Sequence, residues 1–189
     1  MPELDSTIRP FYEGWGIYND RIVEVIREMS ADQLGVRPAP DRWPIWATVG
    51  HTAGSRVFWL CGILGEPGAE STPLPDPIDE PGWEDDLDSP RGSDELVFAL
   101  ESTWEIVDHC LGRWTVESLG DRFSRTTEAG TRWHTRQSVL LRLLSHDAYH
   151  CGEMSQTLGI HGLAQIDLWG PGPVGQPPGL ISPMSRRNR

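Results

Sequence analysis

The sequence predicts an all-α protein, an antiparallel four-helix bundle with a long acidic, proline-rich loop and an irregular C-terminal tail. Apolar residues recur every three or four positions in four long stretches, and few segments alternate as strands do. Proline gathers mainly between and after these stretches. Four long helices with little strand signal favour a bundle. The stretches are residues 6–29, residues 47–64, a helix from Ser93 whose apolar stripe runs to Trp114, and residues 135–159.

The rest of the chain connects or follows these helices. We expect one domain over residues 1–170, because a chain of 189 residues can bury one core without disulfides. Residues 171–189, rich in proline and glycine and basic at the end, are predicted to be disordered. Residues 66–92 carry proline and acid without periodicity, which indicates a long exposed loop. Gly130, within residues 123–135, indicates a hairpin-like connection.

Recognisable capping residues stand at the predicted helix ends. Ser6 is the expected N-cap of the first helix. Ser30 and Gln33 have the spacing of a capping box, which opens a short extra turn. Gly65 suits the end of the second helix. Ser93 is expected to cap the third helix, whose first turn carries carboxylates that complement the helix dipole.

The composition limits the classes of partner. Lys plus Arg number 16 against 28 Asp plus Glu, a formal charge of −12, whereas nucleic-acid binding needs a basic footprint. No apolar run approaches the ~20 residues of a membrane helix, and no signal-peptide pattern is evident. Three widely spaced cysteines without a CxxC pair fit a reducing compartment. We therefore expect a cytoplasmic protein with no nucleic-acid or membrane partner.

Two histidines share one face of the last helix. His146 and His150 are four residues apart, among apolar core positions, and Glu153 follows on the same side. An unpaired polar group that faces a core is costly, but two imidazoles at this spacing can hold one divalent metal. The pattern therefore predicts a metal site. Glu153 either ligates the metal or orients an imidazole.

A metal site needs a further ligand from another helix. His51 is the strongest candidate, because it lies opposite the aliphatic stripe of the second helix, near Gly54 and Ser55. Small residues around an inward histidine leave space for an open coordination position and a substrate. The other histidines, which we expect at solvated, loop or helix-cap positions, are His109, His134 and His161.

Asp147 occupies an ambiguous position between the two histidines. The run "HDAYH" is similar to the zinc-protease pattern H-E-x-x-H, in which the glutamate is a general base. Asp147 stands in its place with a shorter reach. Two interpretations remain open: a carboxylate that moves protons or orients a ligand, and a solvated carboxylate on the helix surface.

The run "HDAYHCGEM", with the histidine of the second helix before it and "LGIHGL" and "DLWG" after it, resembles the DinB/YfiT-like superfamily. The resemblance covers residues 6–170 apart from the loop 66–92. The usual family form is close to H-x-x-H-H-R-G-Q or H-x-x-Y-H-R-G-Q, and here Cys151 and Glu153 replace the usual Arg and Gln. The exchange removes an anion or cofactor contact and adds a carboxylate.

The resemblance implies a metal-dependent enzyme that acts on a small molecule. Its metal ligands would be His51, His146 and His150, and imidazoles suit Zn, Ni or Fe alike. Family members include transferases and isomerases that use the thiols mycothiol or bacillithiol. A bound thiol or water with a lowered pKa would be the nucleophile of an S-transferase, isomerase or hydrolase. The resemblance also implies a homodimer.

Further residues receive roles on this interpretation. Glu153 and Asp147 are the candidate catalytic residues, which would move protons or orient the ligands. Cys151 lies off the histidine face and is expected to be a bystander. Candidate pocket walls are Trp59, Trp104 and Tyr149.

Two other functions fit the same residues. A non-catalytic, stress-associated protein that sequesters metal would close the coordination sphere with Glu153 and leave no cavity. A structural bundle would use its histidines only for hydrogen bonds, and its stability would not respond to a chelator. Access of solvent to the metal separates an enzyme from a sequestering protein.

Overall fold

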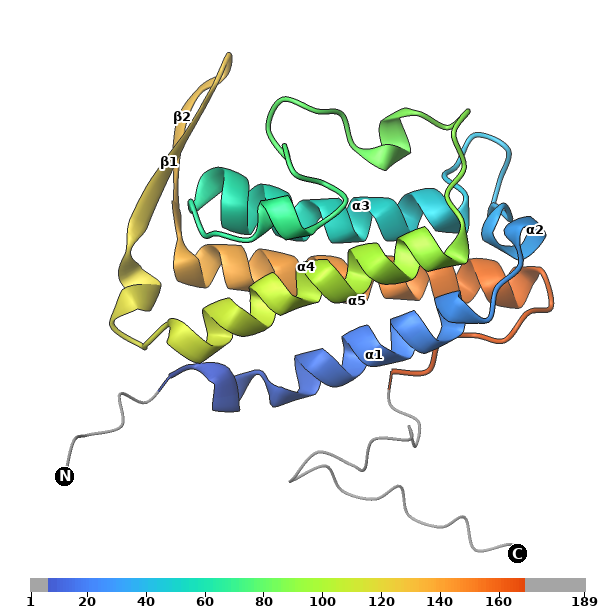
Figure 1. Ribbon diagram of the computed structural model, residues 1–189, viewed down its shortest axis with the longest axis horizontal. Helices are drawn as coiled ribbons and strands as arrows, with labels where there is room; N and C mark the ends of the chain where they lie inside the picture. The colour runs from blue at the N-terminus through green and yellow to red at the C-terminus, as the bar shows by residue number, and fades with distance from the viewer. Residues whose placement is uncertain (1–6, 169–189) are drawn as a thin grey trace, which may run out of the picture.

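The computed structural model describes residues 7–168, and this part of the chain is mostly helical (Figure 1). Four long helices lie side by side, with a short helix at one end and a two-stranded hairpin at the other. None of the helices in these residues is long and apolar enough to cross a membrane. The expected cap Ser6 and the tail 171–189 lie outside the described residues. The helices are α1 (Glu13–Arg27), α2 (Ala31–Leu34), α3 (Ile45–Val57), α4 (Ser93–Arg113) and α5 (Arg136–Ile160).

The first predicted helix is divided in the structure. A 3₁₀ turn, η1 (Arg9–Phe11), precedes α1, and Tyr12 between them has non-helical dihedral angles. Pro10, the second residue of η1, suits a first turn but has no N–H to donate to an earlier one, which favours a separate short element here. The predicted capping box at the start of α2 is confirmed, because both of its reciprocal hydrogen bonds are present.

The second predicted helix ends in a wider turn. After α3 the chain continues as a π-helical turn, η2 (Phe58–Ile63), before Gly65 ends the helix with φ of 72°. Such π turns occur frequently at functional sites. Here the turn carries two adjacent aromatic residues, Phe58 and Trp59, whose rings lie edge to face.

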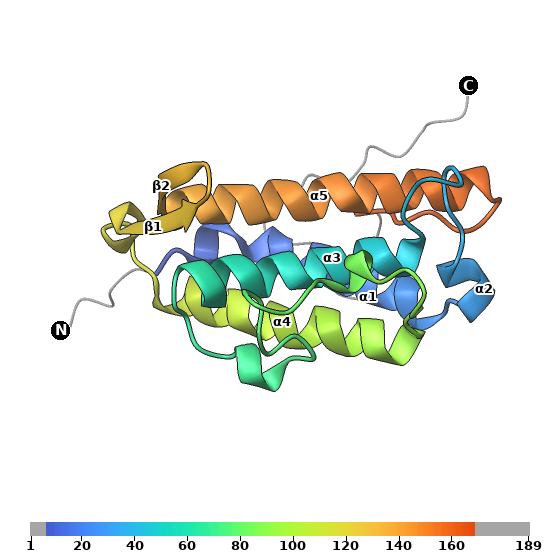
Figure 2. The same ribbon diagram turned by 90° about the horizontal axis from the view of Figure 1, so that it is seen from above.

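The segment 66–92, predicted as an exposed loop, packs against α3. Many of its side chains are exposed, as expected, but it crosses over α3 (Figure 2) and contains the short turns η3 (Ala69–Ser71) and η4 (Trp83–Asp85). A methyl group at Gly50 of α3 would lie only 3.0 Å from Trp83 Cβ. The missing side chain at Gly50 therefore lets Trp83 hold the segment against the helix.

A two-stranded hairpin connects α4 to α5, so the protein is mostly helical and not all-α as predicted. Strands β1 (Arg122–Thr127) and β2 (Gly130–Thr135) pair antiparallel, and Gly130 has φ of 111° at the turn. The hairpin-like connection was therefore correctly predicted. At the start of α4, Gly92 is the N-cap in place of the expected Ser93, because the Glu95 carboxylate accepts a hydrogen bond from the Gly92 N–H.

The buried apolar residues form two clusters along the helices. One lies toward α2 and includes Ile26, Trp46, Leu96 and Leu158. The other lies toward the hairpin and includes Trp15, Leu60, Val107 and Leu143. Between the two clusters, α3 and α5 carry the polar residues Arg56, Asp147 and His150 at buried positions.

Candidate metal centre

Three histidines from two helices meet in the structure. His51 belongs to α3, and His146 and His150 belong to successive turns of α5. The Nε2 atoms of His51 and His146 are 3.0 Å apart, and those of His146 and His150 are 3.1 Å apart. One ligand atom from each ring lies within 4.8 Å of the others. The structure thus brings together the three histidines that the sequence singles out as ligands.

The donor set of this cluster fits a shared cation. Nε2 of His146 faces the Nε2 atoms of both neighbours, and a single N–H cannot donate to both. In a tetrahedral zinc site with Zn–N of about 2.0–2.1 Å, two ligand nitrogens lie ~3.3 Å apart. The observed separations are close to this value. The nitrogen lone pairs therefore converge on a position that suits a divalent metal.

Two carboxylates set the tautomers of two of the rings. His51 Nδ1 is 2.5 Å from Glu84 Oε1, and His150 Nδ1 is 2.7 Å from Glu153 Oε2. Because an ionised carboxylate can only accept, each Nδ1 carries the hydrogen and each Nε2 keeps its lone pair. Glu153 thus contacts the outer nitrogen of His150, the contact expected of a carboxylate that orients an imidazole.

Burial favours the neutral form of the rings. Burial, followed by the charges of His150 and His51, lowers the pKa of His146 to about 3. Burial also lowers the pKa of His150, although the hydrogen bond with Glu153 opposes the shift. A histidine binds metal as neutral imidazole. His146 and His150 are therefore held in the form that coordination requires.

Asp147 follows His146 in the sequence but faces different partners. Its Oδ2 accepts hydrogen bonds of 2.8 Å from Arg56 Nη2 and from Trp15 Nε1. Arg56 is fully buried, and its Nη1 donates to Asn19 Oδ1 at 2.8 Å. Asp147 is only 4% exposed, so the interpretation as a solvated carboxylate is wrong. Its described partners belong to an internal ion pair and not to the three-histidine cluster.

Glu84 is the site residue that the sequence reasoning missed. It lies in the segment 66–92, predicted as an exposed loop, yet its side chain is only 14% exposed. Its contact with His51 joins residues 33 positions apart through irregular backbone, and no spacing rule connects such a pair. The one local signal is its neighbour Trp83, a large aromatic residue able to anchor the segment on α3.

Two other histidines of the described chain lie apart from the cluster. His134 lies on β2, where its ring meets Trp59 edge to face with centroids 4.9 Å apart. His161 is the C-cap residue of α5, as expected, and its Nε2 donates to the carbonyl oxygen of Arg37 at 2.8 Å. Neither ring contacts His51, His146 or His150 within the described contacts.

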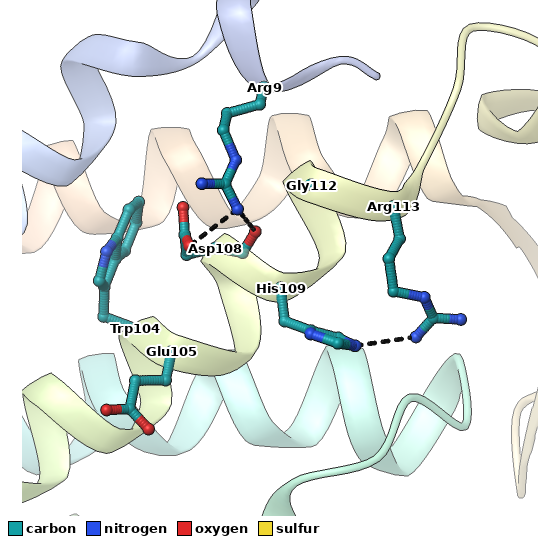
Figure 3. A pocket seen from close by; sticks show the side chains of 7 residues that line it. All are labelled: Arg9, Trp104, Glu105, Asp108, His109, Gly112 and Arg113. Carbon is teal, nitrogen blue, oxygen red and sulfur yellow. Dashed lines mark hydrogen bonds and ion pairs between the residues drawn. The ribbon is translucent and has the colours of Figure 1, made fainter. Parts of the chain in front are cut away.

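A separate hollow on α4 contains two more residues that the sequence singles out. His109 and Trp104 line this space of about 360 Å³ (Figure 3). Arg9 pairs with Asp108 there at 2.9 Å, and His109 Nε2 lies 3.2 Å from Arg113 Nη1. None of the three clustered histidines lines this hollow. Trp104 is therefore a wall of a different pocket from the one expected.

Two pockets flank the histidine cluster. The His51 pocket has a volume of about 640 Å³ and the His150 pocket about 470 Å³. Trp59 lines the first and Tyr149 the second, so both are pocket walls as expected. The His51 pocket is defined by His51, Gly54, Ser55, Phe58, Trp59, Asp76, Glu80, Glu84 and Arg125. The His150 pocket is defined by Trp43, Thr48, Tyr149, His150 and Glu153.

The cysteines are free and held as thiols. Cys151, which stands where the family pattern usually has arginine, is 2% exposed, and burial raises its pKa to about 12. Burial raises the pKa of Cys110 to about 12 and that of Cys61 to about 11. None of the three is poised as a thiolate nucleophile. Cys151 lies in the core and outside the three-histidine cluster, which is consistent with the bystander role expected of it.

Comparison with models of protein families identifies the family of this chain. The model of the DinB superfamily matches residues 19–154, a span that contains all three clustered histidines. A DinB-like protein from Bacillus cereus ATCC 10987 has a similar crystal structure, with a TM-score of 0.55 and 16% identity, over 86% of this chain and 97% of that chain. This likeness shows a shared fold. No curated protein matches the chain. Because the family model spans well over half of its sequence, the chain belongs to the DinB superfamily.

Proposed function

We propose that the chain is a metal-dependent enzyme whose divalent metal is held by His51, His146 and His150. One observation carries the proposal: the three Nε2 atoms converge beside an open pocket. In this account α1, α3, α4 and α5 form an antiparallel four-helix bundle, which holds the two ligand-bearing helices at a fixed separation.

Each residue near the centre has a defined task in this account. His51, His146 and His150 would hold a zinc, nickel or iron ion, which would supply Lewis acidity and so lower the pKa of a coordinated thiol or water. Glu84 and Glu153 hold His51 and His150 in the ligating tautomer. Glu84 Oε2 is buried and has no hydrogen-bond partner within residues 7–168, so it can also accept a proton in the pocket. Asp147, placed in its ion pair, contributes to stability instead.

The pocket favours catalysis over metal storage. A sequestering protein would close the coordination sphere with Glu153, whose Oε2 contacts His150 Nδ1 instead. The His51 pocket of about 640 Å³ is within the usual size range of small-molecule sites. We propose either an S-transferase or isomerase that acts on a small molecule with a low-molecular-weight thiol, or a hydrolase that acts on a small molecule with water. The same proposal describes a cytoplasmic homodimer.

Cobalt loading tests this function against metal storage. We expect one Co²⁺ per chain and absorption bands that shift when azide or a small thiol is added, because an open position admits an exogenous ligand. His150→Ala should abolish cobalt binding, and His109→Ala, in the separate hollow, should leave it intact. A cobalt spectrum that does not change when azide or a thiol is added would support a metal-storage protein. Failure to bind any divalent metal contradicts both functions.

A further inference from the structure

Two arginines without a carboxylate partner lie near the hairpin: Arg125 lines the His51 pocket, and Arg142 lies outside that lining, against Trp59, which is one of its walls. The chain carries 28 acidic residues against 16 basic ones, and some of the arginines elsewhere, such as Arg27 and Arg113, pair with glutamates. Arg125 and Arg142 instead contact aromatic rings and make no ion pair within residues 7–168. In so acidic a chain, unpaired guanidinium groups beside a pocket indicate a site for an anion.

The aromatic rings of the π-helical turn support both arginines. Arg125 Cζ lies 4.9 Å from the centroid of Phe58 and 5.8 Å from that of Trp59. Arg142 Cζ lies 4.6 Å from the Trp59 centroid. The hairpin that carries Arg125 rises beside this end of the helices (Figure 1). Stacking on a ring holds a guanidinium in place and leaves its N–H edges free to donate.

Both arginines are close to the proposed metal centre. Arg125 and His51 line the same pocket. Arg142 stands one turn before His146 on α5, and residues at this spacing share a helix face. After the effect of burial, the charges of Arg142 and Arg125 lower the pKa of His134, which lies against Trp59. A small molecule at the centre can therefore extend toward two guanidinium groups.

The opposite charge in the same pocket limits the anion. Asp76 and Glu80, from the segment 66–92, also line it. A phosphate dianion or a polyanion would be repelled by these carboxylates. A single carboxylate needs contact only with the arginine end, where guanidinium offers it two parallel N–H donors. The charges therefore favour a monocarboxylate over a phosphate.

We infer that Arg125 and Arg142, stacked on the Phe58–Trp59 pair, bind the carboxylate of a small substrate whose reacting group lies at the three-histidine centre. The position of that reacting group rests on the proposed function. Arg125 and Arg142 are specificity-determining residues in this account, because they select the charge of the substrate and take no part in the bond that is changed.

Matched pairs of thiols test this inference on the cobalt-loaded protein. One series runs from mercaptoacetate to 6-mercaptohexanoate, and the other contains the mercaptoalcohols of equal length. The cobalt–thiolate absorption reports the Kd of each. We expect at least one acid to bind about tenfold more tightly than its alcohol, because a hydrogen-bonded charge pair contributes at least that factor. The double variant R125Q/R142Q should bring the ratio near one without weakening the alcohol.

A third unpaired arginine provides the matched control. Arg122 also lies on β1, but it stacks on Trp133 at 4.9 Å and, unlike Arg125 and Arg142, on neither Phe58 nor Trp59. R122Q should therefore keep the preference for the acid. Loss of the preference in R122Q, with R125Q/R142Q unchanged, would indicate a general surface charge effect and overturn the inference.

A second readout does not depend on metal. The Nε–H NMR signals of Arg125 and Arg142, assigned with the single Gln variants, should shift when 3-mercaptopropionate is added, while that of Arg27, paired with Glu101, should not. If the protein binds no metal but shows these shifts, the proposed function is contradicted and the inferred carboxylate site is still supported. Metal binding with unshifted signals, or with acids and alcohols bound equally, overturns the carboxylate site alone.

Discussion

His146 and Asp147 are adjacent in the sequence and belong to polar clusters of opposite character. The cluster of Asp147 is compensated in charge, because Oδ2 of the carboxylate pairs with Arg56 and all three nitrogens of that guanidinium find acceptors, while Asp147 Oδ1 is buried without a hydrogen-bond partner in residues 7–168. The cluster of His146 is uncompensated, because three Nε2 atoms face one another with too few hydrogens to share. A buried cluster whose opposite charges are paired is costly to break, whereas imidazole nitrogens that converge with too few hydrogens indicate a cationic ligand.

The contrast predicts that damage to the compensated cluster appears as lost stability. Asp147→Asn leaves the Arg56 charge buried and unpaired, so we expect the free energy of unfolding to fall by about 3–5 kcal/mol. Urea denaturation with a chelator present measures this without a metal contribution. The exposed pair Arg9–Asp108 is the control, and Asp108→Asn should cost only about 0–1 kcal/mol. Equal losses in the two variants would remove the distinction between the clusters.

Damage to the uncompensated cluster should appear as lost metal. At a free metal concentration a hundred times Kd, the wild type should gain about 2.7 kcal/mol of stability, and His150→Ala should gain none. With a chelator present, the free energy of unfolding of His150→Ala should lie much closer to that of the wild type than that of Asp147→Asn does. Thermal unfolding with and without Zn²⁺ measures both. A variant that still gains stability from zinc contradicts the assignment of His150 as a ligand.

The orienting carboxylates should have intermediate effects. Glu84→Gln and Glu153→Gln should each weaken metal binding by about 10- to 100-fold, because each removes the acceptor that fixes an imidazole. The Glu84 effect should be larger, since its side chain is 14% exposed against 47% for Glu153. Competition with a chromophoric chelator gives the Kd values. Asp79→Asn, an exposed acid of the same segment, is the control and should leave Kd unchanged.

The smallest effect is expected at Cys151, which belongs to neither cluster. Cys151→Ala should cost about 1 kcal/mol of stability and leave metal affinity unchanged. Because its thiol is buried and its pKa is raised to about 12, iodoacetamide at pH 8 should alkylate it only after unfolding. Peptide mass spectrometry follows the alkylation. Rapid modification of the native protein would show that Cys151 reaches the solvent.

The features that follow from local periodicity were predictable from the sequence. The face shared by His146 and His150 depends only on helical spacing, and the capping box of Ser30 and Gln33 is a three-residue pattern. The position of His51 beside Gly54 follows from the same geometry on α3. Helical geometry decides such features without reference to the rest of the fold.

Features that depend on distant contacts were not predictable. Glu84 reaches His51 through irregular backbone, and no periodicity places a residue of such a segment. Arg56 is buried although arginine is rarely so, because partners on α1 and α5 satisfy it. At the start of α4, Gly92 and Ser93 both suit an N-cap, and the contact of Glu95 decides between them.

X-ray absorption at the zinc edge tests the central claim, that three imidazole nitrogens hold one divalent metal, most directly. The zinc-loaded wild type should give a first shell of nitrogen and oxygen at about 2.0–2.1 Å, with the outer-shell scattering of three imidazole rings. His51→Ala and His150→Ala should lose one ring each if any zinc remains. A sulfur shell near 2.3 Å, or a first shell without imidazole scattering, would contradict the account.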